Sequence, residues 1–107
     1  MLLREIVKDF PTKEKFDGEI EINQVEFEPD KVKDNCLFIC LKQDFETAKE
    51  YIQKAISHGA KAVVTSHVGL EKLGAEAVCV DDIRMAFSVF CSNFYQNPEN
   101  KLKIIGV

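Results

Sequence analysis

The chain has 107 residues, enough for one domain that buries about two-thirds of its unfolded surface without needing a disulfide or a metal. Hydrophobic residues make up 46% and charged residues 30%, and the net charge is −4, which together describe a soluble globular protein without the basic surface of a nucleic-acid binder. No apolar run approaches the roughly 20 residues of a membrane helix, so we expect a cytoplasmic domain with neither nucleic acid nor membrane as a partner.

The N-terminal part is predicted to hold one short helix, a loop and one or two strands. Apolar residues recur at helical spacing over residues 2–10, and Pro11 predicts the end of that helix. The polar stretch 12–19 is predicted to be a mobile loop. Residues 20–27 alternate between apolar and polar in two phases, which predicts one bulged strand or two short strands before Pro29.

The clearest signals are a buried strand and the helix that follows it. The apolar run 36–41 is typical of a strand covered on both faces, and Asn35 suits the preceding turn because it tolerates a left-handed backbone. The apolar positions of 48–56 follow one helix face. Thr47 and Glu50 have the spacing of a capping box, and Gly59 predicts the helix end.

Strands and helices continue to alternate up to the last residue. We expect a strand at 62–64, a short helical turn at 68–73, a strand at 75–80, a helix at 82–96 and a final strand at 102–107. Strands joined by helices run parallel through right-handed crossovers. The sequence therefore predicts a single domain, 1–107, with a three-layer α/β/α fold and a mainly parallel, possibly mixed, sheet.

The four cysteines are predicted to be reduced and buried, because each lies among apolar residues and no C-x-x-C pair occurs. Cys36 and Cys40 could share one strand face, with His58 and His67 completing a zinc site after folding. Plain apolar packing explains the same spacing more simply. We therefore expect no metal site.

Four short patterns follow one another along the chain: Lys31-Val32-Lys33-x-x-x-Leu37-Phe38, Gly59-Ala60-x-Ala62-Val63-Val64, Val80-Asp81-Asp82-x-Arg84 and Phe94-Tyr95-x-x-Pro98. Together they resemble the N-terminal domain of Mur ligases of the UDP-N-acetylmuramoyl-tripeptide synthetase type. The resemblance implies a Mur ligase N-terminal fold that holds the uridine diphosphate end of a peptidoglycan precursor. Residues 101–107 resemble the strand that leads into the ATP-binding domain of those enzymes, and we expect that strand to self-associate here.

The loop that would bind ATP is absent from this sequence. A G-x-x-x-x-G-K-[ST] loop is needed because its N–H groups cradle phosphates and its hydroxyl holds magnesium. We therefore expect no catalytic residue and no cofactor in this chain. ATP and Mg²⁺ would belong to a parent ligase that forms carbon–nitrogen bonds.

Two family motifs differ at the positions that the resemblance assigns to uridine binding. Where the family has Asp-Ser-Arg, this chain has proline at the serine position, which offers neither a hydroxyl nor an N–H. Where the family has a glycine-led loop ending in Asp-Gly-His, the glycine is Gln43, and Thr47 is predicted to keep the helix cap. The resemblance thus implies weak binding of a UDP-N-acetylmuramoyl peptide, with these candidate residues: Phe27, Pro29, Asp44, Phe45 and Glu46.

Each candidate also has a structural interpretation. The two phenylalanines could stack on a uracil or pack at a strand edge, and the two acidic residues could accept hydrogen bonds or form a solvated loop. His58 suits the negative end of a helix, and His67 beside Ser66 lacks a third orienting group. Asp81, Asp82 and Arg84 predict a helix cap and an ion pair.

Two functions remain open at this point. The first is a non-catalytic precursor-binding domain of a Mur-type ligase. The second is a stand-alone diverged paralogue that acts as a protein-interaction module.

Overall fold

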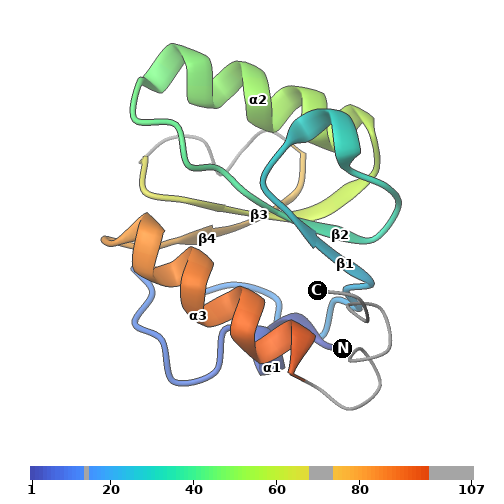
Figure 1. Cartoon of the computed structure of the whole chain (residues 1–107), viewed down its shortest axis with the longest axis vertical. Helices are drawn as coiled ribbons and strands as arrows, with labels where there is room; N and C mark the ends of the chain where they lie inside the picture. Colours follow the sequence, from blue (N-terminus) through green and yellow to red (C-terminus); the bar gives the residue numbers. More distant parts are fainter. Residues whose placement is uncertain (14, 68–73, 97–107) are drawn as a thin grey trace.

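The computed structural model describes residues 1–13, 15–67 and 74–96, and it shows a parallel sheet between two layers of helices (Figure 1). The strands lie in chain order, and each described pairing is parallel: β1 (Gln24–Glu26), β2 (Cys36–Ile39), β3 (Ala60–Thr65) and β4 (Glu76–Cys79). One face is covered by α2 (Phe45–Ser57), and the other by α1 (Leu3–Ile6) and α3 (Ile83–Tyr95). The predicted three-layer α/β/α fold is confirmed.

The centre of the molecule is β2, which is buried on both faces as the sequence predicts. Its side chains alternate between two apolar clusters, since successive side chains of a strand point to opposite sides. Phe38 belongs to the cluster under α2, whereas Leu37 and Ile39 belong to the cluster under α1 and α3. All three side chains are fully buried, so β2 anchors both layers.

The turn before β2 and the turn after α2 take the backbone conformations that the sequence predicts. Asn35 has φ 62° just before β2, and Gly59 has φ 116° just after α2. The Asn35 N–H donates to the Gly59 carbonyl at 3.1 Å, so the two turns support each other. This contact fixes the amino-terminal ends of β2 and β3 side by side.

The first helix is shorter than predicted. It ends at Ile6 instead of continuing to Phe10, because Asp9 adopts φ 63° and the chain turns back before Pro11. Phe10 still joins the core, with its ring edge-on to Phe90 at a centroid distance of 5.1 Å. Helical spacing in the sequence therefore identifies the buried residues but not the helix length.

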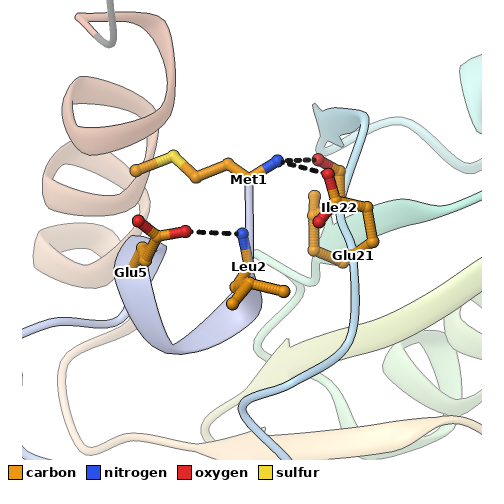
Figure 2. Close-up of polar contacts among 5 residues, drawn as sticks. All are labelled: Met1, Leu2, Glu5, Glu21 and Ile22. Atoms are coloured by element: carbon orange, nitrogen blue, oxygen red, sulfur yellow. Dashed lines mark hydrogen bonds and ion pairs between the residues drawn. The ribbon is translucent and has the colours of Figure 1, made fainter.

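The segment 20–22 pairs with the N-terminus and not with the sheet. Leu2 and Glu21 form an isolated antiparallel bridge, and only residues 24–26 become a strand. The Met1 ammonium contacts a Glu21 carboxylate oxygen at 3.0 Å and the Ile22 carbonyl at 3.1 Å (Figure 2). The Leu2 N–H donates to Glu5 Oε1 at 3.0 Å. The two predicted phases of residues 20–27 are thus two separate segments.

The remaining predicted segments are the polar stretch 12–19 and the elements that follow β3. The Lys13 N–H donates to the Cys79 carbonyl, and the Arg4 N–H to the Gly18 carbonyl, so the polar stretch is tied to the domain at both ends, and its mobility stays a prediction. The predicted strand at 75–80 and helix at 82–96 are confirmed as β4 and α3. The predicted helical turn at 68–73 and the final strand at 102–107 lie outside the described residues.

Candidate functional site

A cavity of about 560 Å³ opens beyond the carboxyl ends of β1 and β2, where open parallel sheets usually bind their ligands. Its walls come from the β1–β2 connection, which contains the short 3₁₀ helix η1 (Pro29–Lys31), from the turn after β2, and from one face of α2 and the start of α3. The lining residues are Phe27, Glu28, Pro29, Asp30, Leu41, Lys42, Tyr51, Lys54 and Arg84.

Two ion pairs form part of this wall. Lys54 of α2 is hydrogen-bonded to the Asp30 carboxylate, and this bond lowers the pKa of Asp30 below its usual range. Glu28 pairs with Lys31 at 3.3 Å. The first pair ties η1 to α2, which fixes the width of the cavity on that side.

Phe27 and Pro29 are the two sequence candidates that the structure places at the cavity. The Phe27 ring lies edge-on to Phe87 at 5.3 Å, and 44% of the residue remains exposed. Pro29 is buried and is the first residue of η1, where its fixed φ suits a helix start. Phe27 therefore packs at an edge and still presents a ring to the cavity.

The helix cap predicted at Thr47 is wrong. Helix α2 begins at Phe45, and the cap is Asp44, whose Oδ2 accepts from both the N–H and the hydroxyl of Thr47 at 2.9 Å. These hydrogen bonds lower the pKa of Asp44, so its carboxylate is charged at neutral pH. The hydroxyl of Thr47 is a donor here and does not accept from the backbone.

Asp44, Phe45 and Glu46 lie at the start of α2 and not in the predicted solvated loop. None of the three lines the cavity. Phe45 is 42% exposed, and its ring lies edge-on to the ring of His67 at 5.7 Å. The structure thus divides the five candidates into two at the cavity and three at the helix start.

The two histidines have structural positions. His58 is the C-cap of α2, as its predicted place at the helix end requires. His67 Nε2 lies 3.1 Å from the Lys42 carbonyl oxygen, and its backbone N–H donates to Thr65 Oγ1 at 3.0 Å. These contacts hold the turn after β2 against the end of β3.

Sequence reasoning missed most of the charged lining. Lys42 follows the buried strand at its carboxyl end, a position that could have identified it, and its ammonium lies 5.1 Å from the centre of the Tyr51 ring. Arg84 was expected to form an ion pair at the start of α3. Asp82 does cap that helix by accepting from the Met85 N–H at 3.0 Å, but Asp81 pairs with Lys13 at 3.0 Å, and Arg84 faces the cavity instead.

The thiols and acidic groups show no metal-binding arrangement within the described part of the chain, where no three His, Cys, Asp or Glu side chains converge. Cys36, Cys40 and Cys79 are buried and form no disulfide, as predicted, whereas Cys91 forms no disulfide and is only partly buried. Burial raises the pKa of the Cys36 thiol to about 12 and that of Cys91 to about 11. Within the same ranges, none of the helices is long and apolar enough to span a bilayer.

Fold and cavity together define an α/β domain with a ligand-sized pocket at the carboxyl edge of a parallel sheet. No family model matches the chain. Curated relatives nevertheless align with nearly all of it, and they are Mur ligases, so the chain belongs to the Mur ligase family.

Three UDP-N-acetylmuramoyl-L-alanyl-D-glutamate–2,6-diaminopimelate ligases illustrate the similarity. The protein from Caldanaerobacter subterraneus subsp. tengcongensis is 36% identical over 107 residues, which are 100% of this chain and 22% of the relative. The protein from Alkaliphilus oremlandii is 34% identical over 110 aligned residues, again 100% of this chain and 22% of the relative. The protein from Fusobacterium nucleatum subsp. nucleatum is 32% identical over 102 residues, 95% of this chain and 20% of the relative. The chain therefore spans about a fifth of the length of these relatives.

Proposed function

We propose that this chain is the non-catalytic N-terminal domain of a Mur-type ligase and that its cavity holds the nucleotide end of a UDP-linked peptidoglycan precursor. The observation that carries the proposal is the similarity along the whole chain to ligases whose names specify UDP-N-acetylmuramoyl-L-alanyl-D-glutamate. The chain spans only about a fifth of the length of those relatives. Its share in their activity is therefore a proposal.

The cavity supports a precursor-binding role by its size and its lining. Its volume of about 560 Å³ lies within the range of ligand pockets, and it combines an exposed aromatic ring, Phe27, with the cations Lys42 and Arg84. A nucleotide offers the matching features, because it carries a flat ring and negative phosphates.

Uridine recognition is expected to be weak. At Pro29 there is neither a hydroxyl nor an N–H to offer a base, since proline has no backbone donor. The sequence also lacks the glycine-rich loop that would hold ATP and magnesium, so the proposal assigns the ligation step to a parent protein.

Titration of the isotope-labelled chain with UDP-N-acetylmuramoyl-L-alanyl-D-glutamate, followed by NMR, tests this role. We expect saturable shifts at Phe27, Lys42 and Tyr51 with a Kd on the order of a millimolar, which corresponds to about −4 kcal/mol. Mg-ATP should not bind with micromolar affinity, because the sequence lacks the glycine-rich loop that cradles its phosphates.

Phe27→Ala and Phe45→Ala form a matched pair for the same titration. Both aromatics are exposed to a similar extent, 44% and 42%, but only Phe27 lines the cavity. Phe27→Ala should weaken precursor binding, and Phe45→Ala should leave it unchanged. The proposal fails if the precursor produces no saturable shifts, or if Phe45 and not Phe27 controls them.

The alternative function is that of a stand-alone diverged paralogue, a protein-interaction module that uses either the same cavity or residues 101–107, and the latter lie outside the described part of the chain. It stays a prediction, as does the cytoplasmic location. The precursor titration separates the two functions, because a protein-interaction module has no need to bind the precursor.

A further inference from the structure

Most of the charge around the cavity is already neutralised by neighbouring side chains. Lys54 is paired with Asp30, and the Glu28 carboxylate is paired with Lys31. Lys42 and Arg84 are different. Within the described residues, neither of them has a carboxylate partner, although both line the cavity.

The polar side chains on β1, which leads into the cavity wall, are committed to the backbone. The Gln24 amide donates to the Lys31 carbonyl and accepts from the Lys33 N–H, each at 2.9 Å. Glu26 Oε1 accepts from the N–H groups of Phe27 at 3.0 Å and Glu28 at 3.3 Å. Neither Gln24 nor Glu26 lines the cavity, so these partly engaged side chains are not placed to read the edge of a base there.

The charge of Arg84 does not stabilise the helix to which the residue belongs. It lies in the first turn of α3, where the positive end of the helix dipole disfavours a cation. Lys42 comes from a different element, the turn after β2, where its ammonium lies over the Tyr51 ring and no carboxylate of the described ranges pairs with it. Two cations from separate elements thus share one cavity and remain available to an anion.

We propose that this cavity selects its ligand by charge and not by base: Lys42 and Arg84 hold a diphosphate, and purine and pyrimidine nucleoside diphosphates bind equally well. The inference rests on the proposed function, because it states what the same cavity selects. Phe27 contributes a ring surface, which stacks on any base without reading its edge.

Titrations at low ionic strength without magnesium test the proposal with four probes: inorganic pyrophosphate, ADP, UDP and uridine. The labelled chain and NMR provide the readout. ADP and UDP should bind with Kd values within about threefold of each other, because no base-edge contact separates them, and pyrophosphate should also bind saturably. Uridine alone should give no saturable shifts, and added salt should weaken all three diphosphates.

Charge-removing variants assign the contacts. Lys42→Gln and Arg84→Gln should each weaken pyrophosphate binding by about threefold to tenfold, the range expected for a partly solvated charge-assisted contact. Lys33→Gln is the matched control, because it removes the same charge from an exposed residue outside the cavity lining. It should change binding by less than about twofold, since bulk electrostatics is screened.

A gain of binding provides a second, independent readout. Asp30→Asn removes a carboxylate from the lining and releases Lys54 as a third cation, so pyrophosphate should bind more tightly. Asp81→Asn breaks a comparable surface pair with Lys13, outside this cavity, and should have no such effect. Because the gain arises in a folded protein, it cannot be produced by a variant that fails to fold.

The outcomes separate this inference from the proposed function. If UDP binds more than about tenfold tighter than ADP, or if uridine alone binds saturably, base recognition is present and the charge inference is overturned while the proposed function stands. If pyrophosphate and ADP bind but the muramoyl precursor does not, the charge inference stands and the proposed function fails. If no diphosphate binds, or if Lys42→Gln and Arg84→Gln match Lys33→Gln, the charge inference is overturned.

Discussion

The close approach of the α2–β3 turn to β2 leads to a prediction about Gly59. An alanine there would have to keep φ 116°, a conformation that costs an L-residue about 1–2 kcal/mol. Its Cβ would also lie 2.9 Å from the Asp34 Cα and 3.0 Å from the Asp34 nitrogen, and neither atom can rotate away. Overpacking of this kind costs about 1–3 kcal/mol. Gly59→Ala should therefore lower the free energy of unfolding by about 2–5 kcal/mol, measured by urea denaturation.

Gly74→Ala is the matched control for this prediction. Gly74 has nearly the same φ, 112°, but the nearest atom to an added Cβ is Ile56 Cγ2 at 3.9 Å, an ordinary contact. Gly74→Ala should therefore lower the free energy of unfolding only by the conformational cost, about 1–2 kcal/mol. In a chain that already carries Asp34→Ala, adding Gly59→Ala should still lower the free energy of unfolding, because the added Cβ also meets backbone atoms of residue 34. Equal losses at Gly59 and Gly74 would show that Asp34 is free to move and would refute the steric argument.

Two further predictions concern the acidic residues of the helix start and the cavity wall. Asp44→Ala should lower Tm by about 4–8 °C, whereas Asp44→Asn, which keeps the acceptor, and Thr47→Val should each lower it by about 2 °C or less. A larger loss for Thr47→Val than for Asp44→Ala would restore Thr47 as the cap. The lowered pKa values of Asp44 and Asp30 mean that their contribution to stability is present above the unfolded-state pKa and is lost as pH falls through the folded-state values. The urea concentration at the unfolding midpoint should therefore fall when the pH is lowered below about 4. This fall should be smaller in the double variant Asp30→Asn/Asp44→Asn. An equal fall in both proteins would assign the acid sensitivity to other carboxylates.

The central β-α-β unit was predictable because its signals are local. The apolar run of β2, the single apolar face of α2 and the left-handed residues Asn35 and Gly59 are all visible in short windows of sequence. The start of α2 was not, since Asp44 and Thr47 are both residue types that cap helices well and lie only three residues apart. Which of the two becomes the N-cap, with an extended backbone, depends on how the rest of the domain packs around the helix start.

The N-terminal region shows a different limit. Its helical spacing from residue 2 to residue 10 reflects burial against one face, and the structure achieves that burial with a four-residue helix and a turn. The helix stops because the chain turns at Asp9, which has φ 63°, and Phe10 then packs on Phe90 of α3. Long-range contacts of this kind override helical periodicity.

The candidate site depends even more on tertiary pairing, because charge compensation is decided between residues far apart in sequence. The spacing of Asp81 and Arg84 predicts an ion pair, as on any helix start. In the structure Asp81 instead forms an ion pair with Lys13, from the N-terminal part of the chain. Among the described residues, the pairing of Asp81 with Lys13 leaves Arg84 without a carboxylate partner, whereas Lys54 on the same cavity wall is paired with Asp30. The charge that a ligand meets in this cavity is therefore set by partners outside it as much as by the residues that line it.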